Sequence, residues 1–489
     1  MEPQDAVYAH LRILLENFYS FIVQESGTEP LMVPSLRQKI YEHERFMPLV
    51  QAIVNDAQLA KFFPVLRQSP DFILDSDSVK ELQSVIIWSD GSAEGMNPLT
   101  LCAAIIGDVF RYLWSWGDDP SLDDVLKRLP DSIELARNLA QKRRVKVPAV
   151  VSIHNIKLVR GLTIQIGLAV LRVPIRYDKF RLVALLINQD ANALALRLET
   201  DFSAIHIRSI SRDSDAHEEQ KKTQALIESI GYKSMERQGR SFQNEINRAC
   251  LAIVLSAPRD VIFSPVQGWS AAVNPLSDMN HSGISNARTF NSPYPVQTIG
   301  KAAERRMARF ASLIERYPDV LKAGIRRLLL AITERMYPED GFVDAIICWE
   351  NLFSGTPETT LRVCGAMAKL LSPANDERRS NMYRELGDLY TLRNKIVHGS
   401  ADDVPEGIYK SRDLAIKYAI DALRILYTRD DLITVNDSNK RGQMLLLRLR
   451  AIRSARVPQT RMRRNRRHLP YPYKAPTVQL GPKPRVGAS

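Results

Sequence analysis

The stretch Tyr390-Thr-Leu-Arg-Asn-Lys-Ile-Val-His-Gly399 decides how the C-terminal part of this chain is interpreted. It ends an amphipathic helix with an arginine (Arg393), an amide (Asn394) and a histidine (His398), and a glycine follows at once. Arginine can hold a phosphate by two parallel hydrogen bonds, and histidine readily moves protons near neutral pH. Together they form a minimal set for cutting RNA without a metal. They equally fit a helix that ends in a surface arginine and histidine with a glycine C-cap, and spacing alone leaves both interpretations open.

The sequence around this stretch predicts an all-α helical bundle over residues 301–428. Apolar residues recur every three or four positions in segments that are separated by short polar turns, most of them with proline or glycine. This pattern is typical of an up-and-down bundle. Its helices are expected at 302–316, 320–336, 342–353, 359–371, 377–398 and 411–427.

The rest of the chain predicts further parts, so the expected fold class is α+β with several domains. Residues 1–145 carry helical periodicity and predict a helical N-terminal region. Residues 146–275 predict a mostly β domain, because short β-branched runs alternate with a period of two. A recognition role for this domain is expected from the architecture alone. Residues 276–300 are rich in Asn, Ser and Pro and predict a linker.

Eight strands are expected in or next to residues 146–275. A polar stretch over residues 216–250 predicts a helical segment before the last two strands. The expected strands are 145–153, 155–159, 162–175, 181–188, 193–200, 204–210, 250–257 and 260–269.

The net charge of +12 resides in the C-terminal tail. Thirteen Lys or Arg and no acidic residue occur from 441 to 489, which leaves 54 basic and 55 acidic residues in the first 440. Residues 429–489 predict a disordered Pro- and Arg-rich tail. A short basic helix over 443–453 is an alternative within this tail. The tail is expected either to contact RNA or to act as a solvated solubility tail. The candidate RNA-binding residues are Arg461, Arg463, Arg464, Arg466 and Arg467.

The composition argues against several classes of protein. No run of about 18 apolar residues occurs, and the acidic N-terminus lacks the basic start of a signal peptide. We therefore expect a cytoplasmic protein without a membrane span. The four cysteines form no Cys-x-x-Cys pair and no histidine spacing is typical of metal ligands, so neither a metal site nor a disulfide is predicted. No phosphate-binding glycine loop of an ATPase occurs, and no cofactor is expected.

Several runs of the C-terminal region follow one another in a recognisable order. They are Glu350 before the pair Leu352-Phe353, the small and aliphatic run 360–371, Glu377-Arg378-Arg379, the run 386–390, and Arg393-Asn394 followed by His398-Gly399. This order resembles the Apea-like HEPN family, over roughly residues 320–428. Two residues depart from the family pattern: Asn394 stands where several relatives have serine, and Trp349 is bulkier than the residue usual before the acid.

The resemblance implies a helical bundle, homodimerisation and frequently RNase activity in bacterial phage-defence or toxin systems. It implies a metal-independent endoribonuclease that leaves 2′,3′-cyclic phosphate ends, with Arg393, Asn394, His398 and Glu350 as catalytic residues. The regions before residue 301 are expected to receive a phage-derived trigger or a regulatory partner. The alternative is a non-catalytic HEPN-type module that binds RNA or a protein.

The spacing of the candidate residues has a consequence for their assembly. Arg393 and His398 lie about 140° apart around an ideal helix, so they share no face and one chain supplies a poor catalytic pair. A two-fold dimer would bring two arginines and two histidines to one cleft. Glu350 is expected either to hold the Arg393 guanidinium in place or to form only a structural ion pair.

Overall fold

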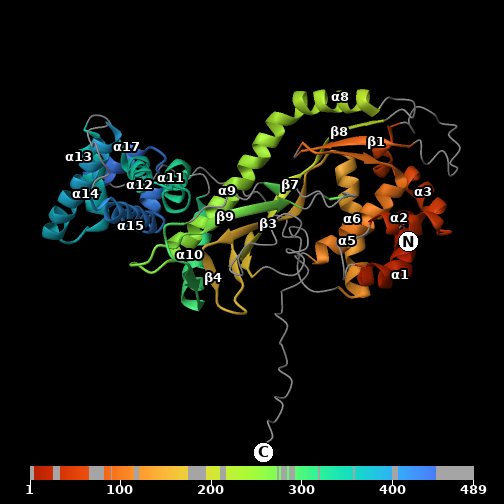
Figure 1. Ribbon diagram of the computed structural model, residues 1–489, viewed down its shortest axis with the longest axis horizontal. Coiled ribbons are helices and arrows are strands. Elements are labelled where there is room, and N and C mark those ends of the chain that lie inside the picture. Colours follow the sequence, from red (N-terminus) through yellow and green to blue (C-terminus); the bar gives the residue numbers. More distant parts are fainter. Residues whose placement is uncertain are drawn as a thin grey trace, which may run out of the picture. The chain divides into compact units, whose positions relative to one another are not determined.

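A computed structural model shows the chain as two units, Met1–Leu449 and Arg450–Ser489 (Figure 1). The described residues all belong to the first unit, and they are 5–25, 33–64, 82–89, 91–114, 120–173, 194–209, 216–272, 275–276, 284–285, 292–317, 320–355, 358–398 and 406–447. Several predictions therefore lie outside the described residues: Gly399, the strand expected at 181–188, and the candidate RNA-binding residues Arg461, Arg463, Arg464, Arg466 and Arg467.

The N-terminal region contains the predicted helices, which enclose one apolar core. Every one of these helices contributes buried side chains to it, for example Leu11, Leu49 and Ile106. The last helix begins with a capping box, in which the Ser121 hydroxyl accepts from the Asp124 amide and the Asp124 carboxylate accepts from the Ser121 amide. The helices are α1 (Ala6–Glu25), α2 (Val33–Glu42), α3 (Phe46–Asn55), the 3-10 turn η1 (Leu59–Phe62), α5 (Pro98–Trp114) and α6 (Leu122–Ala140).

The prediction of a helical N-terminal region missed two strands. Strands β1 (Ser84–Trp88) and β2 (Ala93–Met96) form an antiparallel hairpin, and β8 (Ala204–Ser209) pairs with the other edge of β1. The sequence of β1, Ser-Val-Ile-Ile-Trp, is short, apolar and β-branched, which favours a buried strand. The ring of Trp88 lies 5.1 Å from the ring of Phe202, so the hairpin shares its core with the middle region.

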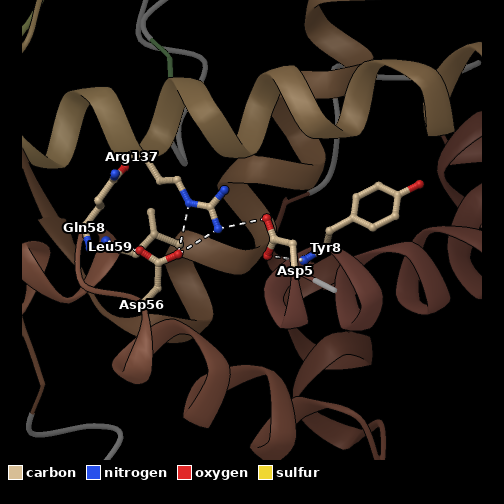
Figure 2. A network of polar contacts seen from close by, with 6 residues as sticks. All are labelled: Asp5, Tyr8, Asp56, Gln58, Leu59 and Arg137. Atoms are coloured by element: carbon tan, nitrogen blue, oxygen red, sulfur yellow. Dashed lines mark hydrogen bonds and ion pairs between the residues drawn. The ribbon is translucent and has the colours of Figure 1, made fainter. Parts of the chain in front are cut away.

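A polar network ties three parts of the N-terminal region together, as Figure 2 shows. Arg137 of α6 donates two hydrogen bonds to the Asp56 carboxylate, at 2.9 and 2.7 Å, and lies 2.9 Å from the Asp5 carboxylate. Asp56 also accepts hydrogen bonds from the backbone amides of Gln58 and Leu59, both at 2.9 Å. Burial raises the pKa of Asp56, but the hydrogen bonds from Leu59, Arg137 and Gln58 outweigh burial and lower the pKa below its usual value.

The middle region contains the predicted strands in one antiparallel sheet, with the strand order β10-β9-β3-β7-β6-β5. In its centre, β3 and β7 pair from Val145 opposite Phe202 to Ile153 opposite Leu194. A separate parallel pair joins β4 to β11. The strands are β3 (Val145–His154), β4 (Ile156–Leu158), β5 (Ile164–Ile166), β6 (Ala169–Arg172), β7 (Leu194–Phe202), β9 (Val266–Ala272), β10 (Ile284–Ser285) and β11 (Gln297–Ile299).

Two predictions for this region were wrong. Residues 250–257, expected as a strand, mostly form the last turns of α9 (Tyr232–Ser256), which follows α8 (Ala216–Leu226) and a π-helical turn (Ile227–Gly231). A continuous apolar run fits a buried helix as well as a buried strand, and residues 251–255 are fully buried. The end of the predicted linker forms the strand β11. The sequence did not predict this strand, because β11 pairs with β4, which is distant in the sequence, and no local pattern reveals such a pairing.

The C-terminal region is helical as predicted, and each expected segment begins and ends within a few residues of an observed helix. Helix α12 contacts α11, α13, α14, α15 and α17, which gather in one bundle drawn in green to blue in Figure 1. Its buried Trp349 donates a hydrogen bond to the Ala415 carbonyl at 3.1 Å. The helices are α10 (Lys301–Arg316), α11 (Lys322–Thr333), α12 (Pro338–Phe353), α13 (Thr359–Leu371), α14 (Asp376–Val397), α15 (Ile408–Leu426), α16 (Asp430–Ile433) and α17 (Ser438–Leu446).

The prediction that a disordered tail begins at residue 429 was wrong for residues 430–447, because α16 and α17 belong to the bundle. Arg441 of α17 is 1% exposed and donates to the carbonyls of Leu352, Leu432 and Val435 at 2.5, 3.3 and 2.5 Å. Burial lowers the pKa of Arg441 to about 10. A basic residue that the sequence assigns to the tail is therefore a buried structural residue.

Two arginines bind the end of α9, one from α15 of the bundle and one from α10, which packs mainly against α9 and β5 although the prediction placed it in the bundle. Arg424 of α15 donates to the carbonyls of Leu255 and Ala257 at 2.9 and 2.5 Å, and Arg306 of α10 donates to the Ser256 carbonyl at 2.6 Å. The last carbonyls of a helix lack partners within the helix, and arginine side chains satisfy them here. None of the described helices is long and apolar enough to cross a membrane.

Candidate functional site

The helix that carries the candidate residues is defined at both ends. Asn375 caps the start of α14 by accepting a hydrogen bond from the Arg378 amide at 2.7 Å, and Asp376 and Glu377 lie in its first turn. At the other end His398 is the C-cap residue, and its amide donates to the Asn394 carbonyl at 3.0 Å. The candidate arginine, amide and histidine therefore occupy the last turns of one helix, as the sequence predicts.

Glu350 of α12 contacts Arg393 of α14 through one carboxylate oxygen. The Oε1 atom of Glu350 lies 3.5 Å from Nη2 of Arg393, and the side chains are 21% and 18% exposed. The predicted contact between these two residues is therefore present. A catalytic role and a structural role of Glu350 would both use this ion pair.

Tyr390 is a third member of this cluster, and sequence reasoning assigned it no role. Its hydroxyl donates to the same Glu350 oxygen at 2.5 Å, and the Arg393 guanidinium carbon lies 5.8 Å from its ring centre. Burial, and then the hydrogen bond to Glu350 and its negative charge, raise the pKa of Tyr390, so the phenol stays protonated and donates. The spacing of Tyr390 and Arg393 could have indicated this contact, since residues three apart on a helix lie on one face.

The Arg393 guanidinium contacts two side chains and has N–H donors that these contacts do not use. Its Nη1 atom donates to Asn394 Oδ1 at 3.1 Å, in addition to the contact of Nη2 with Glu350. Its buried Nε atom has no hydrogen-bond partner in the described part of the chain. A guanidinium carries five N–H donors, so a phosphate can still be held by a guanidinium that these side chains have already oriented.

His398 is exposed at the end of α14 and is not brought to Arg393 within one chain. Among the described residues no hydrogen bond or ion pair joins its imidazole to Arg393, Asn394 or Glu350. The structure therefore unites three of the four predicted catalytic residues with Tyr390 and leaves the histidine open to solvent.

The described residues offer no group of three or more His, Cys, Asp or Glu side chains that could hold a metal ion. The cysteines Cys102, Cys250, Cys348 and Cys364 are buried and free, and burial raises the pKa of each thiol. The chain matches no protein-family model, no curated protein and no solved structure.

Proposed function

We propose that the C-terminal bundle is an Apea-like HEPN-type domain, and that the chain is a metal-independent endoribonuclease of a bacterial phage-defence or toxin system. The observation that carries the proposal is the orientation of Arg393 by Glu350 and Asn394, next to the exposed His398 at the same helix end. The order of the motifs that resemble the family adds support.

The chemistry of the proposed reaction divides among these side chains. A proton leaves the 2′-hydroxyl, charge builds on the phosphorane, and the departing 5′-oxygen receives a proton. Arg393 would bind the phosphate by its planar fork, and His398 would transfer a proton, a contribution typically worth about 10²- to 10⁴-fold. Asn394 would orient the phosphate, and Glu350 would fix the guanidinium.

The proposed enzyme acts as a homodimer. Arg393 and His398 lie about 140° apart around an ideal helix, so a two-fold axis that apposes two such helix ends would bring two arginines and two histidines to one cleft. The arginines 461, 463, 464, 466 and 467 of the tail would contact RNA, and a phage-derived trigger or regulatory partner would act through residues 1–300. The proposed place of action is the cytoplasm.

One observation favours a second candidate, a non-catalytic HEPN-type module that binds RNA or a protein. Arg393 already has a carboxylate partner, and a half-buried ion pair of this kind can serve packing alone. In that case the residues at the end of α14 would stabilise the domain or a dimer and would transfer no proton.

Expression in bacteria separates the two candidates. The wild-type chain should slow growth if it cuts RNA, and His398→Ala should relieve this effect because it removes the proton-transfer group. Arg384→Ala is a matched control, because Arg384 is exposed on the same helix and should leave the growth defect unchanged. A chain that is equally tolerated with and without His398 would favour the binding module.

A further inference from the structure

Glu350 also lines a polar cleft. The cleft has a volume of about 550 Å³ and opens between the start of α11, the end of α12 and the start of α17. The residues that matter for its chemistry are Lys322, Ala323, Glu350, Asn351, Ser354 and Asn436. Glu350 is therefore a wall of the cleft and at the same time the partner of Tyr390 and Arg393.

The side chains around the cleft combine donors, acceptors and one cation. The Asn351 amide uses one N–H to donate to the Ile347 carbonyl at 2.9 Å, and its oxygen and second N–H can serve a ligand. Asn436 and Ser354 also offer both a donor and an acceptor, whereas Glu350 offers acceptors only. Lys322 adds a positive charge at the exposed start of α11, and Ala323 adds an apolar surface next to it.

This mixture matches a nucleotide better than a purely apolar or purely anionic ligand. A base presents N–H groups and ring acceptors on its edges and an apolar ring face, a ribose presents hydroxyls, and a phosphate presents negative charge. The volume falls within the roughly 300–1,000 Å³ of small-molecule sites. The carboxylate of Glu350 would take base or ribose donors, and Lys322 would take the phosphate.

We infer that this cleft binds one nucleotide, namely the residue of a single-stranded RNA that flanks the scissile phosphate held by Arg393. The inference rests on the proposed function, because Glu350 joins the cleft to the candidate site. A free nucleotide has the same chemistry and would bind the same side chains as a regulatory ligand. Binding in the cleft would touch the carboxylate that orients Arg393, so either source would influence the proposed site.

The test uses the full chain with His398→Ala, so that no RNA is consumed, and titrates each of the four nucleoside 5′-monophosphates by calorimetry. Ala323→Trp should fill the cleft and abolish binding, and Lys322→Ala should weaken binding by about tenfold or more, the loss of one charge-assisted hydrogen bond. Both positions are exposed, so neither change removes a core contact. Arg326→Ala, an exposed cation of α11 that does not line the cleft, is the matched control and should bind normally.

A short single-stranded oligoribonucleotide then identifies the source of the ligand. Displacement of the bound monophosphate in proportion to the oligonucleotide would assign the cleft to the RNA strand, whereas a monophosphate that stays bound beside the oligonucleotide would assign it to a free nucleotide. Absence of monophosphate binding at millimolar concentration, or binding that Ala323→Trp leaves unchanged, would overturn the inference. Nucleotide binding by a wild-type chain that cuts no RNA would instead contradict the proposed function and leave the cleft assigned.

Discussion

At the scale of single residues, Arg393 links the fold to the proposed chemistry. Three side chains surround it, and they come from two helices: Glu350 from α12, and Tyr390 and Asn394 from α14. A guanidinium that is oriented before substrate arrives loses little freedom when it binds a phosphate, which is the advantage of preorganisation. The ion pair of Arg393 and Glu350 is only partly exposed to solvent, so its loss would affect both the orientation of the side chains in the site and the stability of the fold.

We predict that Arg393→Ala reduces the rate of RNA cleavage by about 10³-fold or more, because the charge that develops on the phosphorane loses its partner. The free energy of unfolding should fall by only about 1 kcal/mol, because the contact with Glu350 is long and partly solvated. Arg393→Lys should restore part of the rate, since an ammonium cannot form the bidentate fork. Cleavage rates and urea unfolding of the variants, with Arg384→Ala as control, measure both effects. Unchanged cleavage by folded Arg393→Ala would remove Arg393 from the site.

At the scale of elements, α17 shows how one buried residue fixes the end of a domain. Arg441 donates to three carbonyls: that of Leu352 in α12, that of Leu432 in α16 and that of Val435 between α16 and α17. We predict that Arg441→Met lowers the free energy of unfolding by about 3–5 kcal/mol, because three hydrogen bonds from a buried guanidinium are lost and the Leu352 and Val435 carbonyls lose this donor. Urea unfolding followed by circular dichroism measures this change.

A pair of truncations provides the control for Arg441. A chain that ends at residue 447 keeps α17 and should unfold like the full chain, whereas a chain that ends at residue 440 loses Arg441 and should be destabilised as strongly as Arg441→Met. Equal stability of the two truncated chains would show that α17 does not belong to the stable bundle.

The network around Asp56 predicts a pH dependence. The pKa of Asp56 is lowered in the folded state, so its ionised form adds stability above its unfolded pKa and this stability is lost as the pH falls through the folded value. We predict that Asp56→Ala costs about 2–4 kcal/mol near pH 7, and that its difference from wild type shrinks below about pH 4. Asp131→Ala, which removes an exposed ion pair of α6, is the control and should cost less than about 1 kcal/mol at either pH. Urea unfolding curves near pH 7 and below about pH 4 measure these free energies of unfolding. If the difference between Asp56→Ala and the wild type were the same at both pH values, the predicted linkage would be contradicted.

Sequence patterns were sufficient where a helix has one apolar face and clear ends. The segments of 301–428 are of this kind, and α14 begins and ends close to the predicted limits because Asn375 caps its start. Patterns failed where burial comes from distant partners: residues 251–255 are apolar on all sides, and β11 depends on β4. In the candidate site, the contact of Glu350 with Arg393 was predictable, but Tyr390 was missed. The cleft was not predictable, because its walls come from α11, α12 and the segment assigned to the tail.

At the scale of the whole molecule, the proposed enzyme needs two chains. Each chain carries one Arg-Asn-x-x-x-His-Gly motif, and no described contact joins the side chains of Arg393 and His398. We predict that a mixture of Arg393→Ala and His398→Ala chains cuts RNA faster than either variant alone, because a mixed dimer keeps one intact arginine and one intact histidine on different chains. Activity of the mixture equal to that of the better single variant would mean that one chain carries a complete site.

Hydrogen bonds connect the middle region of the chain to the C-terminal region. Arg424 of α15 and Arg306 of α10 bind the last carbonyls of α9, so two helices of the C-terminal region hold the helix that lies between β8 and β9 in the chain. A partner that binds the middle region and shifts α9 would act on α15, which packs against the α12 helix that carries Glu350.

Product analysis of RNA cleavage is the measurement that tests the proposed function most directly. The purified full chain is incubated with total RNA in excess EDTA, and the ends of the fragments are identified. We predict fragments with 2′,3′-cyclic phosphate ends from the wild-type chain and from Arg384→Ala, and none from His398→Ala, because the imidazole transfers the proton. Intact RNA with the folded wild-type chain, or the same cyclic-phosphate fragments from His398→Ala, would contradict the proposed function.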